Sequence, residues 1–183
     1  MSQLHPTLWR TCRVIANKTR LELLWLLFRQ DRLCVSDLAA KVGISDPNAS
    51  IQLRALSARG LITPQRNGQQ IFYCPEVNIN VEHAETLLGA LRECHEKNMA
   101  HETVIRQATA FTHAWRIKLV RALDESRQTF SQLLESTEIP APSLSYHLTK
   151  LRARNFIARY GNEYRLKTPN NSFGRVLMKV ARS

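Results

Sequence analysis

The sequence predicts a mainly α-helical protein with small β-hairpin wings, in which two similar domains follow one another along the chain. Three observations lead to this prediction: an internal repeat, apolar residues at helical spacing in each copy, and a glycine-containing turn between two extended runs late in each copy. We expect domains over residues 1–80 and 109–183, joined by a helical linker over 81–108 in a pseudo-two-fold arrangement.

The repeat is clearest late in each domain. "SDPNASIQLRALSARGLI" (45–62) aligns with "PAPSLSYHLTKLRARNFI" (140–157) after a shift of 95 residues, and proline, serine, leucine and isoleucine coincide along it. Farther upstream, a one-residue slip aligns "RLELLWLL" (20–27) with "RIKLVRAL" (116–123). Agreement at so many apolar positions is not expected by chance, and it indicates a tandem duplication.

The first half of each copy predicts two helices. Apolar residues recur at helical spacing at Leu21, Leu24 and Leu27, and at Ile117, Val120 and Leu123. A shorter helix is expected over 35–42 and over 130–137. Ser36 and Ser131 are the expected N-caps of these shorter helices, because a serine oxygen accepts a hydrogen bond from an unpaired N–H group of the first turn.

A third helix follows a tight turn. Asp46 and Pro47 predict its start in the first copy, as a cap followed by a first-turn proline. We expect the helix to end at Gly60 in the first copy and at Asn155 in the second. Glycine and asparagine are the residues that best tolerate the left-handed conformation that closes a helix.

A β-hairpin is predicted at the end of each copy. Asn67-Gly68 lies between the extended runs "LITPQR" and "QQIFYC", and Gly161-Asn162 lies between "FIARY" and "EYRLK". Helix, helix, turn, helix and hairpin, in this order, predict a winged helix-turn-helix in each copy.

The first copy resembles a known family. "IANKTRLELLWLL", "LCVSDLAAKVGIS", "SIQLRALSARGLI" and "RNGQQIFY" are similar to the successive blocks of ArsR-type winged-helix repressors, over roughly residues 8–80. The second copy resembles a more divergent winged helix, most closely at "SLSYHLTKLRARNFI". The resemblance implies a transcriptional repressor that binds double-stranded DNA in a sequence-specific manner.

Basic residues concentrate in the two predicted domains. The formal net charge is +11, from 26 Lys+Arg and 15 Asp+Glu. Residues 1–80 hold 10 basic and 5 acidic groups, residues 81–108 hold 3 and 5, and residues 109–183 hold 13 and 5. Two basic blocks around an acidic segment favour two modules that face a polyanion.

The third helix of the first copy has the pattern of a recognition helix. An apolar stripe of Ala49, Leu53 and Leu56 would dock it on its domain, which leaves the opposite face for base edges in the major groove. The expected DNA-contacting residues on that face are Asn48, Ser50, Ile51, Gln52 and Arg54. Amides pair with adenine, arginine pairs with guanine or phosphate, and isoleucine suits a thymine methyl group.

The second copy and the two wings supply the other predicted DNA contacts. The expected outward-facing residues of the second recognition helix are Ser143, Ser145, Tyr146, His147 and Lys150. The wing residues suited to phosphates or the minor groove are Arg66, Asn67, Gln69, Arg159, Asn162 and Arg165. Because the two recognition helices differ in sequence, the two half-sites of the DNA need not match.

Two further helices have an apolar stripe. The stripe of the linker helix contains Ala84, Leu87, Leu88, Leu91, Cys94 and His95, and the stripe of the last helix contains Phe173, Val176, Leu177 and Val180. In the resembled family, the helix after the wing is the dimerisation helix. The resemblance therefore implies that these helices pair, either within one chain as a pseudo-dimer or between two chains of a homodimer.

One metal site of the family is incomplete here. Metal-sensing members carry two cysteines in an "ELCVCDL" block, whereas this chain has "RLCVSDL" (32–38), in which Cys34 matches the first cysteine and Ser36 replaces the second. Arsenite or cadmium needs two or three thiolates. We expect Cys34 to be a buried small apolar residue, while a redox role beside Arg29 and Arg32 stays open.

A second family site, with the pattern D-x-H-x10-H-x2-E, is also incomplete. His83 matches its first histidine and Cys94 replaces its second, but Val81 and Lys97 occupy the carboxylate positions. Lysine at a ligand position repels a cation. We expect no metal and no cofactor, with Cys34, His83 and Cys94 as the remaining candidate ligands.

Other classes of function fit less well. The chain has no HExxH, GxSxG or phosphate-loop pattern, so we do not expect an enzyme. Few aromatic residues are available to stack on RNA bases. A winged-helix module that binds another protein in an assembly is the alternative. No apolar run is long enough to span a bilayer, and "MSQLHPTLWRTCR" has no secretory signal, so we expect a cytoplasmic protein with reduced cysteines and no membrane partner.

Overall fold

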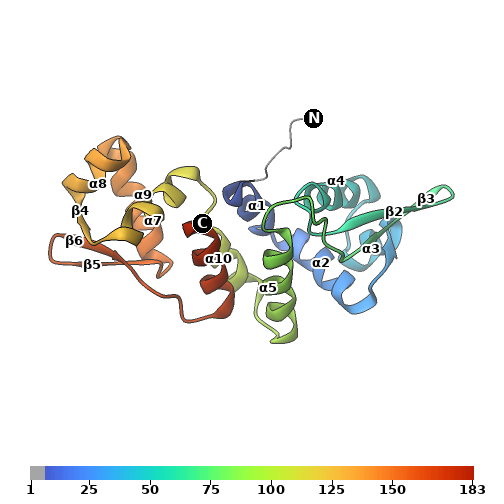
Figure 1. The fold of residues 1–183 in the computed structure, drawn as a ribbon. Helices are drawn as coiled ribbons and strands as arrows, with labels where there is room; N and C mark the ends of the chain where they lie inside the picture. Colours follow the sequence, from blue (N-terminus) through green and yellow to red (C-terminus); the bar gives the residue numbers. More distant parts are fainter. Residues whose placement is uncertain (1–6) are drawn as a thin grey trace. The chain divides into compact units, whose positions relative to one another are not determined.

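The computed structural model describes residues 7–183, so residues 1–6 of the predicted first domain lie outside the described part. The chain forms two compact units (Figure 1). One unit contains Val14–Ile105, and the other combines Leu8–Arg13 with Arg106–Ser183. Each unit is a set of helices with a small antiparallel sheet, and the predicted fold class of two winged helix-turn-helix copies is confirmed.

The first unit has the predicted order of elements. Its helices and strands are α2 (Lys18–Gln30), β1 (Leu33–Cys34), α3 (Val35–Val42), α4 (Asp46–Ser57), β2 (Thr63–Asn67), β3 (Gln70–Cys74) and α5 (Ala84–Glu96). Two further helices, α1 (Leu8–Ile15) and α6 (His101–Ala108), each contribute residues to both units. The buried leucines of α2 and the stripe of Ala49, Leu53 and Leu56 on α4 are 0% exposed. Burial of each such leucine contributes about 1.5–3 kcal/mol, and it confirms the face by which α4 docks.

The sheet of the first unit has the strand order β1-β3-β2. In the register of the hairpin, Asn67 pairs with Gln70, which leaves Gly68 and Gln69 as the two turn residues. The predicted turn at Asn67-Gly68 is therefore one residue too early. Gly68 has a φ of 60°, a left-handed conformation that glycine adopts without strain at the first position of a hairpin turn. The hairpin projects beyond the helices of its unit (Figure 1).

The second unit repeats this arrangement. Its elements are α7 (Ala114–Glu125), β4 (Gln128–Thr129), α8 (Phe130–Thr137), α9 (Ala141–Ala153), β5 (Ile157–Tyr160), β6 (Glu163–Leu166) and α10 (Ser172–Arg182). The sheet order is β4-β6-β5, and Tyr160 pairs with Glu163, so Gly161 and Asn162 form the predicted turn. Phe111 and Phe156 meet edge to face in its core, with ring centroids 4.7 Å apart.

The short helices do not begin with the predicted serine caps. In α3 the N-cap is Cys34, whose Sγ accepts a hydrogen bond from the backbone N–H of Asp37. In α8 the N-cap is Thr129, which forms a capping box with Gln132. The prediction of Ser36 and Ser131 was wrong because both lie inside the first turn, two residues after the cap. Asp46 is likewise the first residue of α4, after Ser45 as the N-cap.

The third helix of each copy ends before the predicted residue, at Ser57 and at Ala153, and the chain turns back at Gly60 and Asn155. Gly60 has a φ of 68° and Asn155 has a φ of 62°, so both are left-handed. The backbone N–H of Leu61 then bonds to the carbonyl of Leu56, and Phe156 bonds to Leu151 in the same way. These bonds satisfy carbonyl groups at the helix ends and lead the chain into the hairpin.

Candidate nucleic-acid interface

The exposed face of α4 carries most of the predicted DNA-contacting residues of the first unit. Asn48, Ile51 and Arg54 are exposed, and Ile51 is 56% exposed, which is unusual for a large apolar side chain. Ser50 and Gln52 are half-buried. The face therefore combines an amide, an apolar contact and a guanidinium, the three kinds of group that distinguish bases in the major groove.

The amide of Gln52 is held by its neighbours. Its Oε1 accepts a hydrogen bond of 2.8 Å from the guanidinium of Arg20, and its Nε2 donates one of 2.9 Å to Oδ1 of Asn48. This chain of bonds orients Asn48 at the surface. Gln52 is thus placed to position Asn48, while Arg54, whose Nε donates to the carbonyl of Ser50 at 3.3 Å, stays exposed.

The corresponding face of α9 differs in character. Ser145 is exposed and Tyr146 is 54% exposed, and the ammonium group of Lys150 lies 5.0 Å from the centre of the Tyr146 ring. Ser143 and Lys150 are half-buried. A lysine held over an aromatic ring in this way presents its charge at a defined place on the helix surface.

His147 does not face outward as predicted. Its side chain is only 5% exposed, and its ring lies 4.5 Å from the ring of His113 and 5.5 Å from that of Trp115. Burial, followed by the proximity of His113 and Arg116, lowers the pKa of His147 to about 4. The ring is neutral at neutral pH, and the residue belongs to the interior of the second unit.

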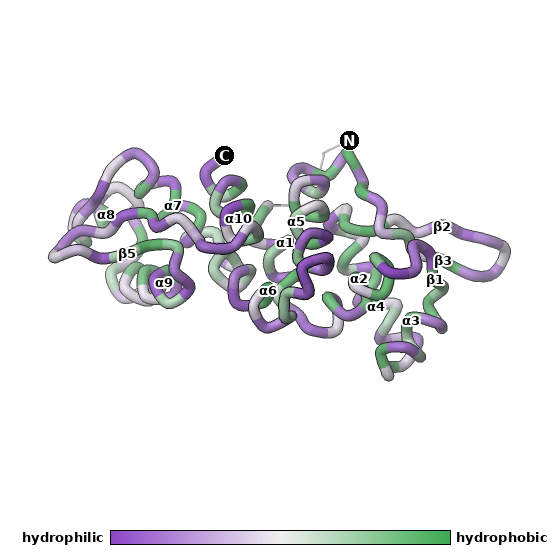
Figure 2. Tube along the Cα trace, turned by 90° about the horizontal axis from the view of Figure 1, so that it is seen from below, coloured by the Kyte–Doolittle hydropathy of each residue, from purple (hydrophilic) through white to green (hydrophobic). Residues whose placement is uncertain are grey.

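The two wings share a detail of their turns. Nε of Arg66 donates to the carbonyl of Gly68 at 3.3 Å, and Nε of Arg159 donates to the carbonyl of Gly161 at 3.0 Å. Both arginines are exposed, and the hairpin of β2 and β3 is largely hydrophilic (Figure 2). Asn67, Gln69 and Asn162 are exposed, and the guanidinium of Arg165 lies 3.8 Å from the centre of the Tyr160 ring.

The candidate metal ligands do not come together. Cys34 lies at the start of α3, whereas His83 is the N-cap of α5 and Cys94 lies in its last turn. Eleven residues of helix separate His83 from Cys94 by about 16 Å. Across the described residues, no three histidine, cysteine or acidic side chains form a group that could hold a metal ion.

All four cysteines are buried and free. Burial, followed by the charge of Glu93, raises the pKa of Cys94 to about 12. Of the arginines near Cys34 in sequence, Arg32 lies over the ring of Phe72 and Arg29 donates to His95.

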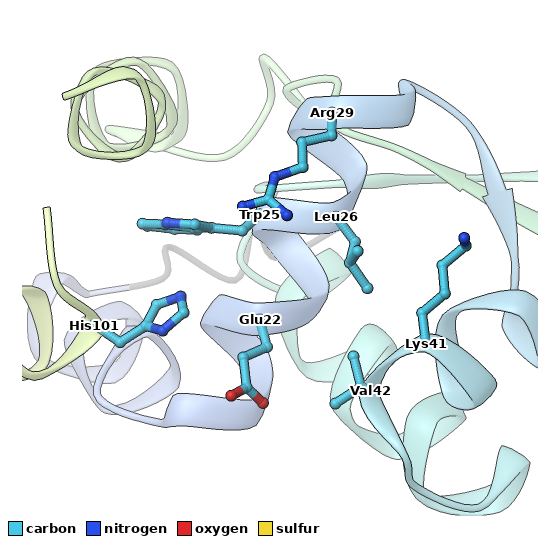
Figure 3. Close-up of a pocket in the computed structure, with 7 residues that line it drawn as sticks. All are labelled: Glu22, Trp25, Leu26, Arg29, Lys41, Val42 and His101. Atoms are coloured by element: carbon cyan, nitrogen blue, oxygen red, sulfur yellow. The ribbon is translucent and has the colours of Figure 1, made fainter. Parts of the chain in front are cut away.

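The first unit has a pocket of about 260 Å³ between α2, α3 and α6 (Figure 3). Trp25 and His101 form one side of it, with ring centroids 5.2 Å apart, and Lys41 and Val42 of α3 form the other. Glu22 contributes a negative charge beside the cations Arg29 and Lys41. Its lining thus carries both signs of charge.

Comparisons with known proteins place these elements in a family. The sequence model described as "Bacterial regulatory protein, arsR family" matches residues 17–63 and residues 115–159, one match in each unit. A "Transcriptional repressor SmtB homolog" from Synechocystis sp. is 41% identical over 59 residues, which is 32% of this chain and 44% of that protein. The chain thus spans less than half the length of this curated relative. No solved structure matches. None of the helices in the described part is long and apolar enough to cross a membrane.

Proposed function

Because this chain belongs to the arsR family of bacterial regulatory proteins, we propose that it represses transcription by binding double-stranded DNA through α4 and α9. It is a regulatory protein and not an enzyme. The observation that carries the proposal is α4, which buries Ala49, Leu53 and Leu56 completely and leaves Asn48, Ile51 and Arg54 exposed on the other side. An amphipathic helix of this kind enters the major groove with its polar face toward the bases.

Each group has a defined part in this binding. Asn48, oriented by Gln52, pairs with an adenine, Arg54 pairs with a guanine or a phosphate, and Ile51 contacts a thymine methyl group. In the second unit, Ser145, Tyr146 and Lys150 form the binding face. The exposed wing residues, which include Arg66 and Arg159, contact phosphates and fix the position of each unit on the DNA.

One chain supplies two different recognition helices. The face of α4 has an amide and a guanidinium, whereas the face of α9 has serines, a tyrosine and a lysine. We infer that the operator is asymmetric, with a different sequence under each unit, because only identical units require a palindrome. Occupation of such a site in a promoter excludes the polymerase, which is the simplest form of repression. The similarity to a protein described as a transcriptional repressor supports this direction of control.

The experiment is an affinity measurement on variants of the exposed face. The Arg54→Ala substitution should weaken binding to the protein's own upstream DNA by about 1–3 kcal/mol, roughly 5- to 150-fold, because it removes a contact to a base or a phosphate. The control is Lys97→Ala, which removes one positive charge from the end of α5, where Lys97 is paired with Glu93. Equal affinities for the Arg54→Ala and Lys97→Ala proteins would contradict the assignment of α4.

A further inference from the structure

A second pocket lies in the second unit, next to its recognition helix. Its volume is about 450 Å³, and it is lined by residues that include Trp9, Arg13, His113, Arg116, Tyr146 and His147. Leu8–Arg13 belongs to this same unit, so all of these residues lie within one compact body. The volume is within the range of about 300–1,000 Å³ that is typical of small-molecule sites.

Arg116 is a buried cation with incomplete hydrogen bonding. Its side chain is 6% exposed, and one terminal nitrogen donates to Oγ1 of Thr112 at 2.6 Å. Its Nε is buried without a hydrogen-bond partner, and Arg116 takes part in none of the ion pairs among the described residues. Burial, followed by the charge of Arg154, lowers the pKa of Arg116. A buried charge without a counter-charge is costly, and a counter-ion at this place relieves the cost.

His147 lines the same pocket, and it has a second polar atom without a hydrogen-bond partner. Its Nδ1 is buried and has no hydrogen-bond partner among the described residues. The neighbouring His113 uses its Nδ1 to accept a hydrogen bond of 3.1 Å from the backbone of Trp115, at the start of α7. Two different side chains that line one pocket, Arg116 and His147, thus each have a buried nitrogen without a partner among the described residues.

The first unit shows how the same positions look when they are satisfied. Arg20 and Gln52 correspond to Arg116 and His147 in the repeat. In the first unit, Arg20 donates to Gln52 at 2.8 Å and its Nε donates to the carbonyl of Val14 at 2.6 Å. In the second unit histidine stands in place of this glutamine, a terminal nitrogen of Arg116 donates to Thr112 instead, and Nε of Arg116 has no hydrogen-bond partner among the described residues. The two copies therefore differ in the residue next to this arginine and in the hydrogen bonds that the arginine makes.

The charges around the second pocket indicate the sign of the charge on its ligand. Arg13 and Arg116 line it together with two histidines, and no carboxylate of the described residues lines it. The lining of the first unit's pocket, by contrast, includes the carboxylate of Glu22 (Figure 3). A metal cation is disfavoured next to two guanidinium groups. A carboxylate suits the site, because guanidinium groups bind its two oxygens in parallel.

We propose that this pocket binds a small organic anion, with its carboxylate on Arg116 and His147 and a planar apolar part against Trp9 and Tyr146. A DNA phosphate is less suited to the site, since Arg116 and His147 are more than nine-tenths buried whereas DNA approaches from the surface. Tyr146 and His147 belong to α9, so the bound anion contacts the recognition helix directly. The anion is thereby an effector of DNA binding, a consequence that rests on the proposed function, although anion binding itself does not.

Calorimetric titration of the full chain with benzoate, in Tris chloride buffer without DNA, tests the proposal. Benzamide is the neutral control of nearly the same shape. We expect benzoate to bind at least about tenfold more tightly than benzamide, a difference of about 1.4 kcal/mol. His147→Gln copies the pair of the first unit, in which the glutamine accepts from a terminal nitrogen of the arginine. It should therefore give the guanidinium of Arg116 an acceptor within the chain, leave the melting temperature unchanged or higher, and weaken benzoate binding at least about tenfold.

Two further variants separate the pocket from general charge. Arg116→Gln should abolish benzoate binding, whereas Arg121→Gln, on the same helix but bonded to the carbonyl of Ala181, should not change it. The absence of benzoate binding to the wild-type chain at about 10 mM, a concentration that detects even millimolar affinity, would overturn the proposal. Unchanged benzoate binding by a folded His147→Gln protein would also overturn it. A third contrary result combines two observations: the wild type binds no benzoate, and Arg116→Gln binds DNA more weakly than the wild type. Together they would mean that the pocket binds a DNA phosphate.

Discussion

Cys34 caps a helix, which is an uncommon use of a cysteine. It lies 6% exposed at the N-cap of α3, with Sγ 3.5 Å from the backbone nitrogen of Asp37 and 3.1 Å from Oγ of Ser36. The repeat aligns Cys34 with Thr129, the N-cap of α8. The thiol therefore takes the place of a hydroxyl group that accepts the same kind of hydrogen bond.

Removal of this cap should destabilise the first unit. We expect Cys34→Ala to lower the free energy of unfolding by about 1 kcal/mol, the usual cost of a lost N-cap. Cys34→Thr, which copies the second unit, should keep most of that stability. Urea denaturation of the three proteins measures the difference. Identical midpoints for the wild type and Cys34→Ala would show that the sulfur contributes no cap.

His147 gives the second unit a dependence on pH. Its pKa in the folded protein is about 4, lowered by burial and by His113 and Arg116, whereas an unfolded chain binds the proton near 6.5. Between these values the unfolded state holds more protons, so stability is complete above pH 6.5 and falls as the pH decreases toward 4. The loss has a maximum slope of about 1.4 kcal/mol per pH unit. We expect the loss of unfolding free energy between pH 7 and pH 5 to be smaller in His147→Gln than in the wild type. Unfolding measured at both pH values in carboxylate-free buffers gives this loss for each protein. Equal losses in the two proteins would contradict the role of His147.

At the scale of the elements, the turn after α4 is more constrained than its counterpart after α9. A Cβ on Gly60 would lie 2.7 Å from Cβ of Val81 and 3.0 Å from that of Ala84. Asn155 has the same left-handed conformation but is exposed. The first copy thus needs glycine for two reasons, conformation and space, and the second copy needs only a residue that tolerates the conformation.

The two positions should respond differently to alanine. Asn155→Ala should cost about 1 kcal/mol, for the left-handed conformation alone. Gly60→Ala adds a clash with well-packed neighbours, which brings the expected cost to about 2–4 kcal/mol. Thermal unfolding of both variants measures this. Equal losses would mean that Val81 and Ala84 move aside without cost.

The elements could be predicted from the sequence because their signals are local. Helical spacing gave most of the helices, although α1 was not predicted and the linker expected over 81–108 is two helices, α5 and α6. Gly60 and Asn155 gave the turns. The orientation of His147 was also encoded: Leu144, His147, Leu148 and Leu151 are spaced as i, i+3, i+4 and i+7, the pattern of a buried stripe. Because histidine is a polar residue, its place in this buried stripe was not recognised. The cap at Cys34 and the unpaired Nε of Arg116 were not predictable, because both depend on distances between side chains that only the folded backbone fixes.

For the whole molecule, the proposed function predicts that the two different units contact different parts of the DNA. We expect Arg54→Ala to weaken protection over one half of a footprint, and Lys150→Ala to weaken it over the other half. The reason is that, under the proposed function, each recognition helix contacts its own half-site. Footprinting at single-nucleotide resolution measures both. Loss of the same half in both variants, or a perfectly palindromic site, would contradict independent binding by the two units.

We propose above that this basic chain is a sequence-specific DNA-binding regulator. The most direct test is fluorescence anisotropy with its own upstream DNA over a series of salt concentrations, beside a scrambled fragment of equal length. We predict tight binding to the upstream DNA alone, with an affinity that falls steeply as salt increases, because Lys and Arg release counter-ions from the phosphates. Weak and equal binding to both fragments at every salt concentration would contradict the claim and favour a protein partner for these winged helices.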